Sequence, residues 1–249
     1  VRVLPRPPLG CLSLTPTYFI HYSCRMTTFR KVVLANNEIY HIYNRSIDRK
    51  PIFTDKNSCA RALLTIQYYR FDNLPIRLSK ILTLPVDQRQ YIFKDIAKDE
   101  NKLVDIIAFN MMSNHFHFEI QQMKDNGISR FLSNFTNSYT KFFNTRTERS
   151  GPLVEGAFKA VRVETDEQLI HLSRYIHLNP VTSFLVKNED LENYPWSSLP
   201  EYLNQKENQF CNKQKILGFF HSVEDYKKFL FDQISYAQEL DKIKHLIME

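Results

Sequence analysis

Residues 104–123 read VDIIAFNMMSNHFHFEIQQM, in which two apolar runs flank a short polar Ser–Asn step. That pattern predicts two antiparallel strands joined by a tight turn. Upstream, EIYHIYNRSI over residues 38–47 alternates aromatic or aliphatic residues with polar ones, which indicates a half-buried strand. Downstream, apolar residues recur every three or four positions over residues 128–143, so an amphipathic helix follows the strand pair.

The neighbouring segments complete an alternation of strands and helices. Asp55 suits the N-cap of a first helix, and AFKAVRVET over residues 157–165 suits a further strand. A helix over residues 166–178 is expected to end before Asn179 and Pro180. The order strand, helix, two strands, helix, strand predicts a ferredoxin-like α+β fold, an antiparallel sheet with helices on one face, plus a C-terminal helical extension.

We expect one main domain over residues 26–200 and the helical extension over residues 201–249. Within the domain, the polar and mixed residues at about 71–102 look like an insertion. The first 25 residues combine several prolines with a broken apolar stretch, whereas Met26 opens a more regular sequence. Residues 1–25 are therefore expected to be a disordered arm or to precede the true start, and not to be a signal peptide.

The composition narrows the class of protein. The 249 residues carry a formal net charge of +6 with 19 Phe and 13 Tyr, and the isoelectric point is near 9.0, which suits a partner made of phosphates and bases. The four cysteines are scattered without a C-x-x-C pair, so neither a zinc site nor a disulfide framework is expected. A reducing cytoplasm is the simple interpretation, and no apolar run of about 18 residues could span a membrane.

The motif HFHFEI places His115, His117 and Glu119 two residues apart. On a strand all three side chains point to one face, while the intervening Phe116 and Phe118 point to the other. Two imidazoles and a carboxylate on one face can ligate a divalent ion of the Mg, Mn or Zn kind. The alternative is an ordinary solvent-exposed polar face on a strand whose other face packs into the core.

Tyr139 lies in the apolar stripe of the helix that follows the strand pair. A tyrosine in such a place is ordinarily a core ring with its hydroxyl at the surface. If the helix packs with Tyr139 facing the histidines, its phenolate could attack a phosphate that a metal ion polarises, which is covalent catalysis. The functional interpretation therefore depends on how this helix packs.

Further polar residues are candidates for contacts with DNA. A polar and basic cluster follows the first strand and another ends the tyrosine-bearing helix, and each could bind phosphate or form a solvated face. These residues are Asn44, Arg45, Arg49, Lys50, Lys141, Arg146 and Arg149. In RYIHLNP, His177 and Asn179, with Arg174 one turn earlier, could line a site or cap a helix, and capping is the simpler role for Asn179.

Five stretches, in order, resemble those of the REP-associated tyrosine transposases, which belong to the single-tyrosine branch of the HUH endonuclease superfamily. They are YHIYNRSIDRKPIF, MMSNHFHFEIQQ, GISRFLSNFTNSYTKFFNTR, GPLVEGAFKAVRVETDEQL and RYIHLNPV with the later YPWSS, and they cover most of residues 38–198. The resemblance implies a ferredoxin-like domain, often a homodimer, that binds hairpin ends of single-stranded DNA. It also implies cleavage and rejoining through a 5′-phosphotyrosine link, with Mg²⁺ or Mn²⁺ orienting and polarising the scissile phosphate.

Carried over by position, the resemblance implies that the two histidines of HFHFEI bind the metal and that Tyr139 is the nucleophile. Related enzymes place a third, polar metal ligand one helical turn after the tyrosine, where this chain has Phe143. Glu119 is the first substitute because it shares a strand face with the histidines. Asn144 is the second because it lies next to that position on the helix, and a water molecule is a further one.

Three functions remain open on the sequence. The first is a transposase that acts on single-stranded DNA at the ends of an element. The second is a catalytically silent or domesticated protein that binds hairpin DNA or RNA with the same fold. The third is a replication initiator or conjugative relaxase, which would carry further histidines, more tyrosines or a helicase portion. Intact His115, His117 and Tyr139 favour the first.

Overall fold

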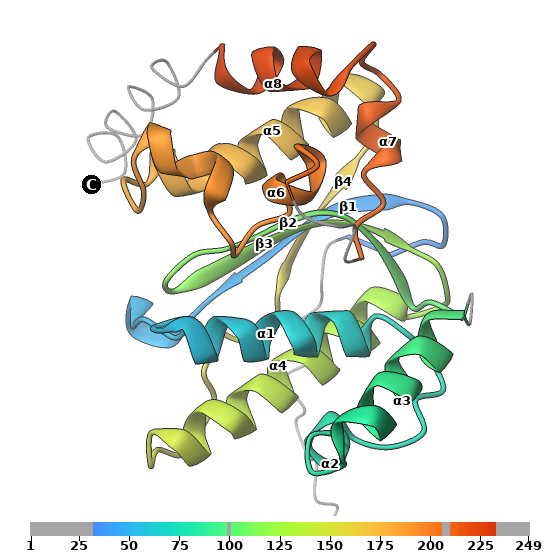
Figure 1. The fold of residues 1–249 in the computed structure, drawn as a ribbon, viewed down its shortest axis with the longest axis vertical. Helices are drawn as coiled ribbons and strands as arrows, with labels where there is room; N and C mark the ends of the chain where they lie inside the picture. The colour runs from blue at the N-terminus through green and yellow to red at the C-terminus, as the bar shows by residue number, and fades with distance from the viewer. Residues whose placement is uncertain (1–31, 99–100, 206–209, 233–249) are drawn as a thin grey trace, which may run out of the picture. The chain divides into compact units, whose positions relative to one another are not determined.

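The computed structural model describes residues 32–98, 101–205 and 210–232, and all of these belong to one compact unit. Its centre is an antiparallel sheet with the strand order β2-β3-β1-β4 (Figure 1). The strands are β1 (Ile39–Arg45), β2 (Val104–Met111), β3 (His115–Gln122) and β4 (Lys159–Val163). The predicted α+β fold with an antiparallel sheet is confirmed. One helix follows β1 and another follows β3, which is the element order of a ferredoxin-like unit.

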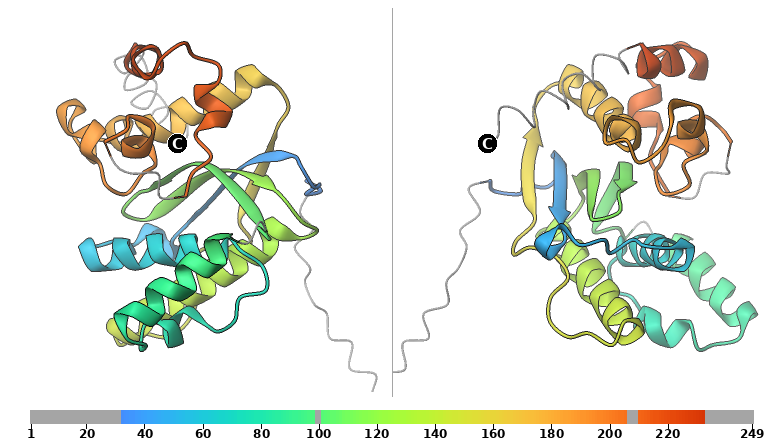
Figure 2. Two further views of the ribbon diagram at one scale, coloured as in Figure 1. Left: turned by 45° about the vertical axis from the view of Figure 1, so that its right-hand side comes forward. Right: turned by 90° about the vertical axis from the view of Figure 1, so that its left-hand side faces the viewer.

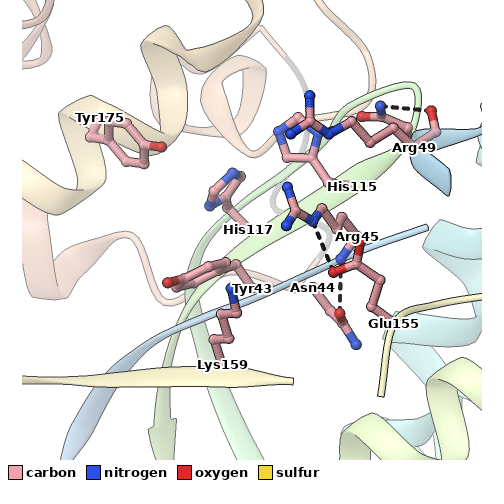
Figure 3. A pocket seen from close by; sticks show the side chains of 10 residues that line it. Tyr43, Asn44, Arg45, Arg49, His115, His117, Glu155, Lys159 and Tyr175 are labelled. Carbon is pink, nitrogen blue, oxygen red and sulfur yellow. Dashed lines mark hydrogen bonds and ion pairs between the residues drawn. The ribbon is translucent and has the colours of Figure 1, made fainter. Parts of the chain in front are cut away.

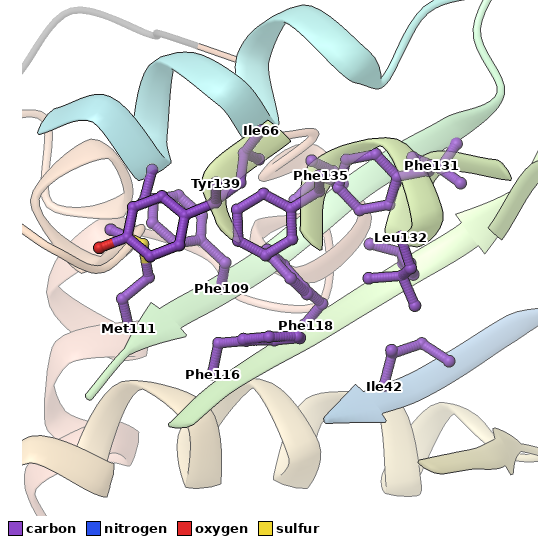
Figure 4. Close-up of a cluster of buried hydrophobic side chains, with 14 of the residues drawn as sticks. Ile42, Ile66, Phe109, Met111, Phe116, Phe118, Phe131, Leu132, Phe135 and Tyr139 are labelled. Atoms are coloured by element: carbon purple, nitrogen blue, oxygen red, sulfur yellow. The ribbon is translucent and has the colours of Figure 1, made fainter. Parts of the chain in front are cut away.

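The two helices of the ferredoxin-like unit, α1 (Lys56–Tyr69) and α4 (Gly127–Arg146), lie on the same face of the sheet (Figure 1). Asp55 caps α1, because its carboxylate accepts hydrogen bonds from two backbone N–H groups of the first turn. At Gly127 a Cβ atom would lie 2.1 Å from the Leu103 carbonyl oxygen, so only glycine lets α4 start so close to the sheet. Phenylalanines of β3 and α4 fill the core between these layers (Figure 4).

Further helices cover the opposite face of the sheet, as Figure 2 shows. They are α5 (Asp166–Thr182), the 3₁₀ turn η2 (Asn188–Asn193), α6 (Leu199–Tyr202), α7 (Gln214–Leu217) and α8 (Val223–Phe231). This second layer has its own core, in which Ile107 of β2 meets Leu178 of α5 and Leu230 of α8. The expectation of helices on one face therefore holds for α1 and α4 but omits this second layer. Every residue of β2 is buried, as is typical of a strand that is covered on both faces.

The C-terminal end of α5 differs from the prediction. The helix was expected to stop before Asn179 and Pro180, but it runs to Thr182 with Pro180 inside it. The proline removes one backbone donor from the helix, and its own carbonyl, which lies near the C-terminal end, accepts hydrogen bonds from the N–H groups of Leu185 and Val186. Asn179 is consequently a residue of the helix and is almost fully buried, with 5% of its surface exposed.

The insertion at residues 71–102 forms α2 (Leu78–Ile81) and α3 (Val86–Lys98), which pack against Tyr68 of α1. The helical character of the C-terminal extension is confirmed as far as α8, and its described part packs into the second layer. Residues 1–25 lie outside the described residues. Within the described ranges, no helix combines the length and the apolar character that crossing a membrane requires.

Candidate active site

A cavity of about 520 Å³ opens at one end of the sheet, where β1 ends and β3 begins (Figure 3). The register explains why residues far apart in sequence meet here: Tyr43 lies opposite His117, and Arg45 lies opposite His115. Helix α5 closes one side with Tyr175, and Lys159 of β4 lies across from it. The cavity is lined by Tyr43, Asn44, Arg45, Arg49, Asn114, His115, His117, Glu155, Lys159 and Tyr175.

Each of the two histidines has its Nδ1 atom engaged by a neighbour. His115 Nδ1 lies 2.7 Å from Asn114 Oδ1, and His117 Nδ1 lies 2.9 Å from Nε2 of His41 on β1. In both rings the second nitrogen, Nε2, is left for another ligand once the proton is assigned to Nδ1. His115 and His117 both line the cavity, with ring centroids 5.1 Å apart, as expected for alternate residues of one strand.

Burial keeps this cluster of imidazoles uncharged. It lowers the pKa of His117 well below the ordinary histidine value, and the nearby His115 and His41 lower it further. Burial likewise lowers the pKa of His115, helped by the charge of Arg45 and opposed by a hydrogen bond with the Asn179 side chain. The pKa of His41 falls to about 4 for the same reason. Neutral imidazoles are the form that binds metal ions.

Helix α5 brings two further groups to the histidines. Tyr175 lies with its ring centroid 5.5 Å from that of His117, and 43% of its surface is exposed. Its hydroxyl points toward the histidine pair in Figure 3. Asn179 lies one helical turn later on the same face of α5, and its side chain reaches His115. A phenol, two imidazoles and an amide therefore converge at one place.

Tyr139 does not belong to this cluster, and the expectation that it faces the histidines is wrong. It lies on the other face of the sheet, in the core with Phe116 and Phe135, and only 3% of its surface is exposed (Figure 4). Its hydroxyl donates a hydrogen bond of 2.6 Å to the Ile52 carbonyl oxygen. Burial raises the pKa of Tyr139, which makes its phenolate harder to form. The physical cause is the apolar stripe of α4, which turns this tyrosine into the core with its neighbours.

The two residues proposed as a third metal ligand also lie away from the cavity. Glu119 is fully buried, has no hydrogen-bond partner among the described residues, and has a pKa raised well above the usual range by burial. Asn144 instead bonds to the Gly151 carbonyl oxygen and to Arg149 at the end of α4. In the described part of the chain, no group of three or more His, Cys, Asp and Glu side chains is placed to hold a metal.

The predicted DNA-binding residues divide between the cavity and other parts of the surface. Asn44, Arg45 and Arg49 line the cavity, where Arg45 Nε lies 2.9 Å from a carboxylate oxygen of Glu155. The residues that lie elsewhere fall into three settings: Lys141 and Arg146 line a separate hollow beside α4, Arg149 binds the loop after α4, and Lys50 pairs with Asp48. Sequence reasoning missed Lys159 and Tyr175 as lining residues of the cavity.

Comparison with known proteins gives two results. The family model described as "Transposase IS200 like" matches residues 35–179. Among solved structures, the chain is similar to a REP-associated tyrosine transposase bound to a REP hairpin, with 15% sequence identity and a TM-score of 0.47. That similarity covers 72% of this chain and 87% of the other. No curated protein matches the sequence.

Proposed function

Because the chain belongs to the family of IS200-like transposases, we propose that it cleaves and rejoins single-stranded hairpin DNA with Tyr175 as its nucleophile. The observation that carries this proposal is the convergence of Tyr175 and Asn179 of α5 on His115 and His117. The matched segment, residues 35–179, contains all four groups. We place this activity in the cytoplasm as part of the proposal, in agreement with the scattered cysteines of the sequence.

The donor atoms fit a divalent ion of the Mg²⁺ or Mn²⁺ kind. His115 and His117 are neutral, and their Nδ1 atoms are held by neighbours, which orients both Nε2 atoms as ligands. The Asn179 side chain adds an amide oxygen, which is a suitable ligand for a hard cation. When bound, the ion supplies polarisation of the scissile phosphate. Glu119 is too deeply buried to take part.

The reaction that the geometry supports is phosphoryl transfer to a phenol. The Tyr175 hydroxyl loses its proton, and its oxygen forms a bond to phosphorus while the bond to the 3′ oxygen of the preceding nucleotide breaks. That oxygen takes up a proton and becomes a free 3′-hydroxyl, and the 5′ phosphate stays on the tyrosine. Attack by a 3′-hydroxyl reverses the step and releases the enzyme, so no high-energy cofactor is required.

The rim of the cavity suits the charged backbone of DNA. Arg49 and Lys159 form no ion pair with a carboxylate in the described ranges, so both are available for phosphate. Arg45 shares its charge with Glu155, and this exposed pair contributes little to stability. One chain supplies all of the proposed reacting groups, so the chemistry does not require the homodimer that the resemblance implies.

The test compares two tyrosines in the same assay. Purified protein is incubated with labelled single-stranded hairpin oligonucleotides from the flanks of the gene, with and without Mg²⁺ or Mn²⁺, and analysed by denaturing electrophoresis. We expect a metal-dependent covalent adduct in the parent and in Tyr139→Phe, and none in Tyr175→Phe. An adduct that survives in Tyr175→Phe and vanishes in Tyr139→Phe refutes the assignment. Tight binding with no adduct in any protein would instead support the binding-only function.

A further inference from the structure

A second hollow, of about 660 Å³, lies on the face of the molecule formed by α1 and α4. Four basic side chains contribute to it, and no acidic residue does. Its lining is Arg61, Tyr69, Arg77, Ser79, Asn134, Asn137, Ser138, Lys141, Phe142, Thr145 and Arg146. Because α5 and the histidines lie on the opposite face of the sheet, this hollow, called here the α1–α4 groove, is separate from the candidate active site.

The charges in the groove are not balanced by the protein. In the part of the chain that the structure describes, Arg61, Arg77 and Lys141 form no ion pair, and only Arg146 does, with Asp55. Arg61 is half-buried, its guanidinium lies 5.3 Å from the Phe142 ring centroid, and its Nε atom is buried without a hydrogen-bond partner. Burial also lowers the pKa of Arg61. Removing a cation from water without a carboxylate beside it costs free energy, and a bound anion would lower that cost.

The shape of the groove favours an extended anion over a small one. The lining residues of α4, from Asn134 to Thr145, recur on one face of the helix and span roughly 16 Å along its axis. That length corresponds to about five phosphates along one strand of a duplex. Amide and hydroxyl groups of Asn134, Asn137 and Ser138 line the first part of this stripe, and the charges of Lys141 and Arg146 lie at its C-terminal end. Such polar and basic groups are those that contact a nucleic-acid backbone without reading its sequence.

We propose that the α1–α4 groove binds the phosphate backbone of the DNA on which the enzyme acts, at a place remote from the cleaved bond. The inference rests on the proposed function only for the identity of the polymer. Arg77 and Ser79 come from the insertion at residues 71–102, so the proposal also gives that segment a role. A DNA with a duplex stem and a single-stranded tail can contact both faces, the stem in the groove and the tail at the histidines.

The experiment measures the affinity of the full chain for a labelled DNA hairpin with a single-stranded tail, by fluorescence anisotropy over a range of salt concentrations. The groove variant is Arg77→Glu/Lys141→Glu, in which both substituted side chains are exposed. The matched control is Lys94→Glu/Lys228→Glu, which changes the net charge equally at exposed positions outside the groove. Melting temperatures of both variants verify that they fold.

We expect the groove variant to bind at least about tenfold more weakly, with the slope of log affinity against log salt smaller by about 1.5. The control should change the affinity by less than about threefold, because neither substituted lysine lines the groove. Equal weakening in the control, or unchanged binding in the groove variant, overturns the proposal. A third outcome also overturns the proposal. If inorganic phosphate raises the melting temperature of the parent but not of the groove variant, and the DNA affinity of the variant is unchanged, the groove holds a small anion and not DNA.

The same assay separates this inference from the proposed function. Tyr175→Phe should bind the hairpin as tightly as the parent and form no adduct. If no protein forms an adduct but the groove variant still loses affinity, the groove is a DNA site and the catalytic assignment fails. If adducts form normally on a short tail oligonucleotide and the groove variant binds the hairpin like the parent, the catalytic assignment stands and the groove proposal fails.

Discussion

At the scale of single residues, the hydrogen bond between His41 and His117 determines which nitrogen faces the cavity. A metal needs the lone pair of His117 Nε2, so the proton must lie on Nδ1 and be donated to His41 Nε2, 2.9 Å away. His41 can accept it because burial holds its pKa at about 4 and keeps the ring neutral near pH 7. His41 is therefore a positioning residue, because it contacts His117, the proposed metal ligand, and not the ion itself.

We predict that His41→Ala weakens Mn²⁺ binding by about 10- to 100-fold, because the His117 ring loses its orienting partner. Isothermal titration calorimetry with Mn²⁺ measures the affinity directly, without an activity assay. His41→Gln, whose amide oxygen can accept the same proton, should recover part of the loss, and the exposed His221→Ala is the surface control. Parent-like affinity in His41→Ala would show that His117 is oriented by other contacts.

The choice of tyrosine shows what single-residue patterns can and cannot predict. HFHFEI was sufficient to predict the histidine pair, because alternation along a strand fixes which side chains share a face. Tyr139 was assigned by carrying the family resemblance over to the helix after the histidines, although its apolar stripe and the following Phe143 both opposed the assignment. Related enzymes have a polar metal ligand one helical turn after the tyrosine, and Tyr139 is followed at that position by Phe143. Tyr175 is followed there by Asn179, and this signal was present in RYIHLNP.

At the scale of elements, the strands themselves were predicted, but the helical layer that covers their second face was not. Alternation in β1 and β3 predicted which side chains share a face, whereas the consecutive apolar residues of β2 are typical of a strand buried on both faces but do not say that α5 covers the second one. The N-cap of α1 could be predicted from Asp55, because a cap depends only on the residues at the start of its own helix. The end of α5 could not be predicted in the same way, because the N–H groups that bond to the Pro180 carbonyl belong to Leu185 and Val186, which follow the helix.

His177 joins three elements of the second layer and predicts a pH dependence of stability. Its Nδ1 lies 2.6 Å from the Tyr226 hydroxyl on α8, and its Nε2 lies 2.7 Å from Ser198 Oγ beside α6. Burial lowers the pKa of His177 from the ordinary 6.5 to about 3. Between these pH values the unfolded chain binds a proton that the folded chain does not, so the free energy of unfolding falls as the pH falls.

The change that tests this is His177→Gln, which removes the titrating ring from the second layer. In urea denaturation, the free energy of unfolding of the parent should fall with pH, and His177 should contribute about 1.4 kcal/mol per pH unit to this fall between about pH 6 and pH 4. The variant should lack that contribution. His177→Gln lowers stability at every pH, so the slope against pH is the readout and not the absolute value. The exposed His221→Gln should keep the parent slope, and a parent slope in His177→Gln as well would contradict the assignment.

At the scale of the whole molecule, the sheet separates two cores with different tasks. The core between the sheet and α1 and α4 supports the groove proposed to hold DNA, and the core beneath α5 to α8 positions Tyr175 and Asn179. The sheet lies between the two cores (Figure 2), and the layers also touch at the β2 edge, where Phe210 packs into the first core and its carbonyl oxygen accepts a hydrogen bond of 2.7 Å from Arg70. Local loosening of one layer should therefore leave the other largely protected.

Leu230 of α8 and Leu132 of α4 offer matched probes of this division, because both are buried leucines, with 0% and 1% of their surface exposed, in different cores. Each change to alanine should cost roughly 2–5 kcal/mol through the cavity that it leaves. In hydrogen exchange, Leu230→Ala should increase exchange in α5 and α8, and Leu132→Ala should increase it in α1 and α4. Leu230→Ala should also reduce adduct formation more than hairpin affinity, because it displaces the proposed nucleophile Tyr175 and not the proposed DNA groove. Uniform exchange across both layers in either variant would mean that the sheet couples the cores, and binding and cleavage would then be lost together.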